Sequence, residues 1–424
     1  MATSYANLPA WRNQMTFLPG NMQLTKPEDM PKEKTWRYKG HAVHVDSCGT
    51  PVGSPVTLVL LHGVGTNARQ MSLLVGLPLA RKYGFHSLAL DCPGYGVTQV
   101  APKSKVTYSD WVDLVDAFVD AQTRRQLNEG RGTRPIVLFG LSAGGMLAYQ
   151  VAARNANVKG VIGMTFLDQR VQEVRDTTAH DLVGSRVGVP LAGVLRGTPL
   201  GGIRLPMPLT SKMRALVNDQ KALRAFITDR SSAGNWVSMR FLADYMTYAP
   251  AKEPEDFETC PILLTQPEED RWTPLRLSEI FLDRIRKVPV KRVTLEKAGH
   301  YPLEQPGIDQ LHKAIAEFIE TFWDVSAKRA GNRRNNARRL KIRNEGTNTL
   351  HPRIRTIGTK FMALMEPRGS VRKVKKLIYV LRAFETDNYT HMCCNEGVLV
   401  SFACATHEDV APSVQCNISL AYFS

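Results

Sequence analysis

The stretch that decides the fold is Gly140-Leu141-Ser142-Ala143-Gly144-Gly145. It follows the apolar run Ile-Val-Leu-Phe at 136–139 and precedes 146–153, a segment rich in good helix formers. A strand, a serine between glycines and a helix form the context of a G-x-S-x-G nucleophile elbow. The glycines allow a sharp turn, hold the serine in a strained conformation and leave its hydroxyl exposed above the sheet edge. A bare G-x-S-x-G occurs by chance in about one chain in ten of this length, so the prediction depends on the surrounding sequence.

Apolar runs on both sides of this stretch predict further strands. They lie at Thr57–Leu61 and Ser87–Leu90 upstream, and at Val158–Leu167, Pro261–Thr265 and Lys291–Leu295 downstream. Continuous apolar runs are typical of strands that are covered on both faces. The segments between them have helical periodicity, notably at 68–82, 108–126 and 308–323. This alternation predicts an α/β protein with a doubly wound, mainly parallel sheet.

Composition and periodicity divide the chain into parts. Residues 1–35 lack clear periodicity and are predicted to form a loose N-terminal arm, whereas 36–325 hold the α/β domain and begin with a strand over 36–45. From about 168 to 258 the alternation breaks, and helical pieces such as 212–225 mix with Gly- and Pro-rich segments. This stretch is predicted to be an insertion into the sheet domain.

The last part of the chain, 326–424, carries most of the positive charge. It has 17 Lys+Arg against 7 Asp+Glu, while the first 325 residues have 38 against 32. Basic clusters at 329–343 and 372–376 are of the kind that contacts nucleic acid or an anionic membrane. A solvated, partly disordered extension is the plainer interpretation, and we assign this part no chemistry.

The cysteines and the N-terminal sequence indicate in which cellular compartment the protein is expected. Seven scattered cysteines without a repeated C-x-x-C favour reduced thiols inside the cell. The N-terminus has no charged start followed by an apolar core, as a signal peptide would. No apolar run approaches the roughly 18 residues needed to span a bilayer. We therefore expect a cytoplasmic protein, and the oligomeric state is not predictable from the sequence.

Four motifs, in order, make the chain resemble a serine hydrolase of the α/β-hydrolase superfamily, of the esterase or lipase kind. They are His62-Gly63-Val64-Gly65, Asp91-Cys92-Pro93-Gly94-Tyr95-Gly96, the stretch around Ser142, and late acidic and histidine segments. The resemblance covers residues 36–325, or 290 of 424. It implies the α/β-hydrolase fold, with the insertion at 168–258 in the position of the family's helical cap. It also implies a triad in the order Ser, Asp or Glu, His.

The resemblance assigns candidate site residues. Ser142 is the expected nucleophile, and a serine hydroxyl needs a base within hydrogen-bond reach. His300 is the expected base, because Ala298-Gly299-His300-Tyr301-Pro302-Leu303-Glu304-Gln305-Pro306 resembles the family's histidine loop and follows the last strand. The backbone N–H groups of Val64 and Ala143 are expected to form the oxyanion hole.

The acidic residue of the triad is open among four carboxylates. Asp270 is favoured because it follows the penultimate predicted strand and precedes the candidate histidine. The family usually has Gly-x-x-Asp here, whereas this chain has Pro267 and two additional carboxylates, so Glu268 and Glu269 are alternatives. Asp168 is a further rival, because some members of the family place the acid after the strand that follows the nucleophile. The role of the triad acid, whichever residue supplies it, would be to orient the histidine and stabilise the imidazolium.

The expected activity is hydrolysis of a carboxylic ester through an acyl-enzyme, without a metal or organic cofactor. The apolar first half of the insertion suits a hydrophobic small-molecule ester, and packing within the insertion explains it equally well. The same triad serves serine peptidases and C–C bond hydrolases, and the fold alone does not distinguish them. A non-enzymatic alternative is an inactive member of the family that acts as a binding module.

Overall fold

The computed structural model describes two ranges in full and several strands by their backbone. The full ranges are 4–129 and 133–321, and the strands are 385–386, 389–394, 398–405 and 415–422. The chain divides into two compact units, Met1–Ala330 and Gly331–Ser424. The basic clusters at 329–343 and 372–376, considered above for contacts with nucleic acid or membrane, lie outside the described residues.

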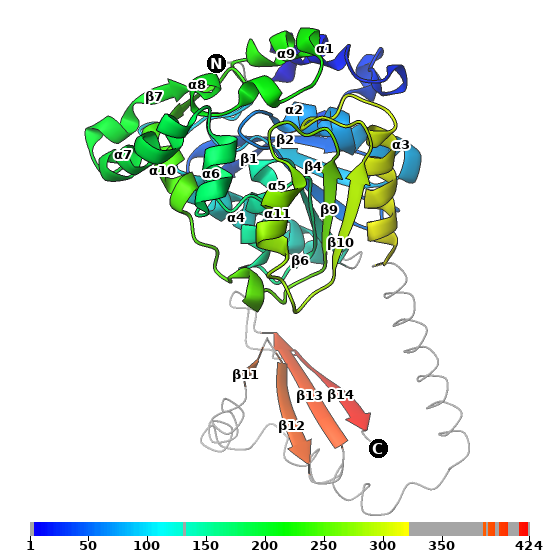
Figure 1. The fold of residues 1–424 in the computed structure, drawn as a ribbon. Helices are drawn as coiled ribbons and strands as arrows, with labels where there is room; N and C mark the ends of the chain where they lie inside the picture. Colours follow the sequence, from blue (N-terminus) through cyan, green and yellow to red (C-terminus); the bar gives the residue numbers. More distant parts are fainter. Residues whose placement is uncertain are drawn as a thin grey trace, which may run out of the picture. The chain divides into compact units, whose positions relative to one another are not determined.

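The first unit is built on an eight-stranded sheet in the order β1-β2-β4-β3-β5-β6-β9-β10 (Figure 1). The strands are β1 (Lys32–Tyr38), β2 (His41–Cys48), β3 (Thr57–Leu61), β4 (His86–Leu90), β5 (Ile136–Gly140), β6 (Val158–Gly163), β9 (Ile262–Pro267) and β10 (Val290–Leu295). All pairs from β4 to β10 are parallel, and β2 joins β1 and β4 in antiparallel pairs. The predicted doubly wound, mainly parallel sheet is confirmed.

The strand predicted over 36–45 is instead a hairpin of β1 and β2. Lys39 and Gly40 turn the chain with φ of 44° and 81°, and Tyr38 pairs with His41. Two consecutive residues with positive φ are typical of a type I′ hairpin turn. This turn was not predicted from the sequence, because lysine is not a usual residue at a turn position with positive φ.

Residues 4–30 pack onto the sheet unit, so the prediction of a loose arm is wrong. The side chains of Tyr5 and Trp11 are 0% and 2% exposed. The Tyr5 hydroxyl lies 2.8 and 2.9 Å from the two carboxylate oxygens of Asp91. The Arg69 guanidinium stacks on both aromatic rings, 4.6 Å from Tyr5 and 4.8 Å from Trp11. These long-range contacts have no local periodicity, which is why the sequence did not reveal them.

Helices cover both faces of the sheet, with α3 and the helix over 307–321 on one side and α4 and α11 on the other (Figure 1). The helices outside the insertion are α1 (Ala10–Met15), α2 (Ala68–Met71), α3 (Leu77–Tyr83), α4 (Tyr108–Asn128), α5 (Ala143–Ala152), α11 (Leu275–Leu282) and the helix over 307–321. The helix predicted over 68–82 contains a π-helical turn at Ser72–Gly76. Among the described residues, no helix is both long and apolar enough to cross a membrane.

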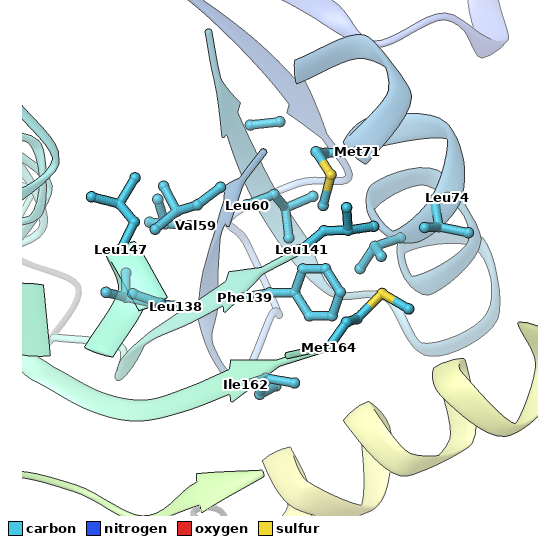
Figure 2. Packing of buried hydrophobic residues seen from close by; sticks show 14 of the residues in the cluster. Val59, Leu60, Met71, Leu74, Leu138, Phe139, Leu141, Leu147, Ile162 and Met164 are labelled. Carbon is cyan, nitrogen blue, oxygen red and sulfur yellow. The ribbon is translucent and has the colours of Figure 1, made fainter. Parts of the chain in front are cut away.

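The central strands are buried on both faces, as their uninterrupted apolar sequences predict. Every residue of β3, β4 and β5 is buried. Successive side chains of a strand point to opposite faces. Figure 2 shows this for β5, where Leu138 lies toward Leu147 of α5 and the ring of Phe139 lies toward Met164. This packing fixes the end of β5, where the Ser142 stretch begins.

Between β6 and β9 the chain leaves the sheet for the predicted insertion. Its elements are α6 (Gln172–Thr178), α7 (Val189–Leu195), β7 (Arg204–Pro206), α8 (Met207–Thr210), α9 (Gln220–Ile227), β8 (Trp236–Ser238) and α10 (Met239–Thr247). Helix α7 packs against α10, and β7 pairs with β8. The helix predicted over 212–225 begins only at Gln220, because the Asp219 carboxylate caps it and accepts the N–H groups of Lys221 and Ala222 at 2.7 and 2.8 Å.

The second unit contains a four-stranded antiparallel sheet in the order β11-β12-β13-β14. Its strands are β11 (Glu385–Thr386), β12 (Tyr389–Cys394), β13 (Val398–Ala405) and β14 (Gln415–Tyr422). The C-terminal extension therefore contains regular strands that the sequence analysis did not predict.

Candidate active site

Ser142 lies at the turn between β5 and α5, with φ 56° and ψ −125°. Such a conformation costs a non-glycine residue about 1–3 kcal/mol, and the surrounding packing must hold it. A Cβ atom on Gly144 would lie 2.3 Å from the carbonyl oxygen of Leu61, and one on Gly145 would lie 2.1 Å from that of Thr165. These positions therefore require glycine, which explains the pattern of small residues around the serine.

His300 and Asp270 form a buried hydrogen-bonded pair. His300 Nδ1 lies 2.8 Å from Asp270 Oδ2, and each side chain is 1% exposed. The Thr273 hydroxyl donates to the same oxygen at 2.6 Å, and the N–H groups of Trp272 and Thr273 donate to Oδ1. Burial raises the pKa of Asp270, but the charge of His300 and these hydrogen bonds outweigh it and leave the pKa below its usual value. Asp270 is therefore a carboxylate at neutral pH.

The second ring nitrogen of His300 differs from the first in its surroundings. Its Nε2 is buried and makes no hydrogen bond to any described residue. Because Nδ1 donates to Asp270, Nε2 carries the lone pair when the ring is neutral. The ring packs 4.8 Å from that of Trp272. The pair thus holds a basic nitrogen in a fixed orientation.

The other carboxylates considered for the acid do not contact His300. Asp168 binds Arg170 in an ion pair of 2.7 Å. Glu268 and Glu269 are exposed, whereas Asp270 turns inward. Among these four carboxylates, only that of Asp270 is hydrogen-bonded to the histidine.

The glycine turn after β3 lies directly against the turn that holds Ser142. A Cβ atom on Gly63 would lie 2.8 Å from the carbonyl oxygen of Leu141 and 2.9 Å from Ser142 Cβ. Within the described residues, the backbone N–H groups of Val64 and Ala143 donate no hydrogen bond. Two unused donors therefore belong to adjacent turns next to the serine.

His62 holds this glycine turn in place. Its Nδ1 donates to the Gly63 carbonyl oxygen at 2.8 Å, and its Nε2 accepts the Cys92 N–H at 2.9 Å. Burial lowers the pKa of His62, so the ring is neutral. Both ring nitrogens are used within the fold, and His62 is a structural residue.

A pocket opens at Ser142 and is lined largely by the insertion. Its lining residues are Val64, Ser142, Leu167, Gln169, Thr178, Ala179, Met207, Thr210, Ser211, Leu242, Tyr245, Met246 and Trp272. Its empty volume, counted out to solvent, is about 440 Å³. The structure therefore brings Ser142 and Val64 into one cavity wall, and Trp272 connects this wall to His300.

The pocket wall also holds a polar group that no sequence motif predicted. Gln169 Nε2 lies 3.4 Å from Thr178 Oγ1 and 3.5 Å from the Tyr245 hydroxyl. All three side chains are buried. They come from separate elements of the insertion and form no motif, so no pattern in the sequence marks them.

The described residues contain no cluster of three or more His, Cys, Asp or Glu side chains that could hold a metal ion. Cys48, Cys92 and Cys260 are free and buried. Burial raises the pKa of each thiol, to about 12 for Cys48 and Cys260. The side chains of the other four cysteines lie outside the described residues.

The sequence is similar to a known protein family and to several curated proteins. A family model described as the alpha/beta hydrolase family matches residues 58–308. Protein ABHD14A of Danio rerio is 38% identical over 82 residues, which cover 19% of this chain and 29% of the relative. Protein phosphatase methylesterase 1 of Mus musculus is 26% identical over 191 residues, which cover 45% and 44%. The chain thus spans less than half the length of these curated relatives.

Solved structures share the fold. A soluble variant of monoglyceride lipase from Saccharomyces cerevisiae, in complex with a substrate analog, superposes with a TM-score of 0.57 at 17% identity, over 72% of this chain and 98% of the lipase. DcsB in complex with its substrate analogue gives a TM-score of 0.50 at 17% identity, over 69% and 98%. At this level of identity the likeness concerns the fold alone.

Proposed function

This chain belongs to the alpha/beta hydrolase family, and we propose that it is a serine hydrolase that cleaves a carboxylic ester through an acyl-enzyme. The observation that carries this proposal is the buried Asp270–His300 pair at 2.8 Å, next to a pocket whose wall includes Ser142. A fold alone does not establish an activity, whereas the chemistry of these side chains indicates one.

In the first half of the proposed reaction, Ser142 Oγ attacks the ester carbonyl carbon while His300 Nε2 takes its proton. The Asp270 carboxylate stays ionised and stabilises the resulting imidazolium through Nδ1–H. The N–H groups of Val64 and Ala143 would bind the oxyanion of the tetrahedral intermediate. The intermediate then collapses: Nε2 returns the proton to the leaving alcohol, the C–O bond breaks, and the acyl group remains on Ser142.

The second half of the reaction uses the same groups with water as the nucleophile. His300 Nε2 takes a proton from water as the oxygen attacks the acyl carbon. The second tetrahedral intermediate releases the carboxylic acid, and the proton returns to Ser142 Oγ. The buried Nε2 of His300 is hydrogen-bonded to no described residue, which supports this role because a general base needs a free lone pair.

The pocket supports a hydrophobic ester as the substrate. Apolar side chains of Leu167, Met207, Leu242 and Met246 line it and would contact an acyl chain or an apolar alcohol. Two of the similar proteins are named as ester hydrolases, the mouse methylesterase and the yeast monoglyceride lipase. Both names agree with ester cleavage and differ in substrate.

Turnover of p-nitrophenyl acetate, butyrate and octanoate tests the proposal, with a peptide p-nitroanilide as the competing substrate. We expect ester turnover by the wild type and a loss of at least about 10⁴-fold in Ser142→Ala. Ser211→Ala is the matched control, since Ser211 lines the same pocket and is expected to be dispensable. Equal turnover by wild type and Ser142→Ala would contradict the proposal, and anilide cleavage in preference to esters would favour a peptidase.

A further inference from the structure

The first half of the insertion presents apolar side chains to solvent. Among the described residues, twelve large apolar side chains are exposed, and nine of these lie between Leu182 and Trp236. Val183, Val194 and Leu209 are 70%, 77% and 67% exposed. From the sequence, this apolar composition suits either a hydrophobic pocket or packing within the insertion. Side chains this exposed do neither, and a concentration of them marks a contact surface.

The same segment is uniformly basic. From Leu182 to Asn218 it contains five Lys and Arg residues and no Asp or Glu, a net charge of +5, while the first 325 residues together carry +6. Arg186 is paired with Asp176 at 2.9 Å. Arg196, Arg204 and Arg214, by contrast, are exposed and form no ion pair with a described carboxylate. These arginines are free to meet anionic groups on a partner.

One short element connects this surface to the pocket. In α8, Met207 is 1% exposed and lines the pocket, whereas Leu209, two residues later, is 67% exposed. Thr210, the last residue of α8, also lines the pocket. Helices α7 and α8 and strand β7 lie at the same end of the sheet unit (Figure 1). A molecule held at the exposed surface would therefore be next to the pocket wall.

We propose that residues 182–214, called here the insertion face, dock onto an anionic lipid surface. Exposed aliphatic side chains would enter the boundary between headgroups and acyl chains, and the unpaired arginines would bind headgroup phosphates or carboxylates. Docking does not depend on the proposed ester hydrolysis, whereas passage of a lipid ester from the surface to Ser142 does.

Charge and composition favour lipid over a protein partner. Two copies of the chain would bring like charges together, since each face carries a net charge of +5 without a carboxylate. Protein interfaces are enriched in Tyr, Trp and Phe. Trp236 is the single aromatic residue among the exposed large apolar side chains of the described chain.

Flotation of the full-length chain with vesicles tests the proposal. The vesicles are phosphatidylcholine alone or phosphatidylcholine with phosphatidylserine. We expect the wild type to bind the anionic vesicles, and the double variant Val194→Asp/Leu209→Asp to bind at least about tenfold more weakly. The matched control is Val52→Asp/Leu127→Asp, because these side chains are 62% and 60% exposed and lie outside the insertion. The control should bind like the wild type.

A second pair of variants tests the charges. Arg196→Gln/Arg204→Gln should weaken binding to anionic vesicles about fivefold per charge at low salt, and less at high salt. Arg37→Gln/Arg124→Gln is the control, since both arginines are exposed, lie outside the insertion and form no ion pair with a described carboxylate.

The outcomes separate the two proposals. All variants keep the basic C-terminal extension, so unchanged vesicle binding by both insertion-face variants would assign binding elsewhere and overturn the docking proposal. Absence of vesicle binding by the wild type would also overturn it. Hydrolysis of dissolved p-nitrophenyl acetate should be the same in all variants, which confirms that they are folded. Absence of ester turnover with normal vesicle binding would contradict the proposed function and leave docking intact.

Discussion

Two apolar regions of this molecule differ in solvent exposure: strand β5 is buried, and part of the insertion is exposed. The residues of β5 from Ile136 to Phe139 are at most 2% exposed, because strands lie on both sides and helices on both faces. In the insertion, Val194 and Leu209 are 77% and 67% exposed. Helices α7 and α8 have seven and four residues. These helices leave Val194 and Leu209 exposed to solvent, so similar composition gives core in one region and surface in the other.

The glycines repeat this contrast. Around Ser142 they allow backbone contacts that no Cβ atom permits, which fixes the serine relative to the turn after β3. In the insertion, Gly193 and Gly202 have no atom within 4 Å of an added Cβ, whereas a Cβ on Gly201 or Gly234 would lie 2.6 or 2.2 Å from a backbone carbonyl oxygen. The sheet region thus positions the proposed chemistry rigidly, and the insertion shapes the pocket and the outer surface.

The largest expected effect concerns the acid in the sheet region. Asp270→Asn should lower kcat for p-nitrophenyl butyrate by about 10³–10⁴-fold, because an amide favours the wrong tautomer of His300. Asp168→Asn is the matched control at the start of the insertion. It should change kcat less than about tenfold, since Asp168 binds Arg170 and not the histidine. The reverse ranking would move the acid to Asp168.

The next effect contrasts burial in the two regions. Leu138→Ala should lower the free energy of unfolding by about 2–5 kcal/mol, because it opens a cavity in the core. Leu138 is fully buried, whereas Val194 is largely exposed. Val194→Ala should therefore change stability by no more than about 0.5 kcal/mol. Urea unfolding followed by circular dichroism measures both. A similar cost for the two variants would mean that the insertion face is packed and not exposed.

The smallest effect concerns the glycines. Gly145→Ala should destabilise the protein by about 1–3 kcal/mol or more, since the added methyl overlaps the Thr165 carbonyl oxygen. Gly193→Ala lies within α7 in open space and should stabilise by about 0.5–1 kcal/mol through its higher helix propensity. Destabilisation by Gly193→Ala would indicate a partner packed against α7.

The sheet could be predicted from the sequence because its signals are local. Buried parallel strands have continuous apolar sequences, and the order of the motifs around Ser142 located their ends. The positions of Asp270 and His300 at the carboxyl ends of β9 and β10 follow from that order. The choice of Asp270 over its neighbours depended on which carboxylate turns inward, and adjacent residues of like chemistry give no such information in a single sequence.

The features that could not be predicted from the sequence depend on contacts between segments that are distant along the chain. Tyr5 and Trp11 are buried by the sheet unit, and nothing in their own neighbourhood indicates it. The polar group of Gln169, Thr178 and Tyr245 forms only when three elements of the insertion meet. Exposure of the insertion face likewise depends on the tertiary structure. Leu and Val are also common in protein cores, so their presence in the sequence does not indicate exposure.

Labelling with a fluorophosphonate probe tests whether Ser142 is an activated nucleophile. The adduct is located by mass spectrometry of proteolytic peptides. We predict one stoichiometric adduct on Ser142 in the wild type and in Ser211→Ala, and none in folded Ser142→Ala. His300→Ala should label far more slowly, because the serine loses its base. An adduct that persists in Ser142→Ala, or the absence of any adduct in the folded wild type, would contradict the account.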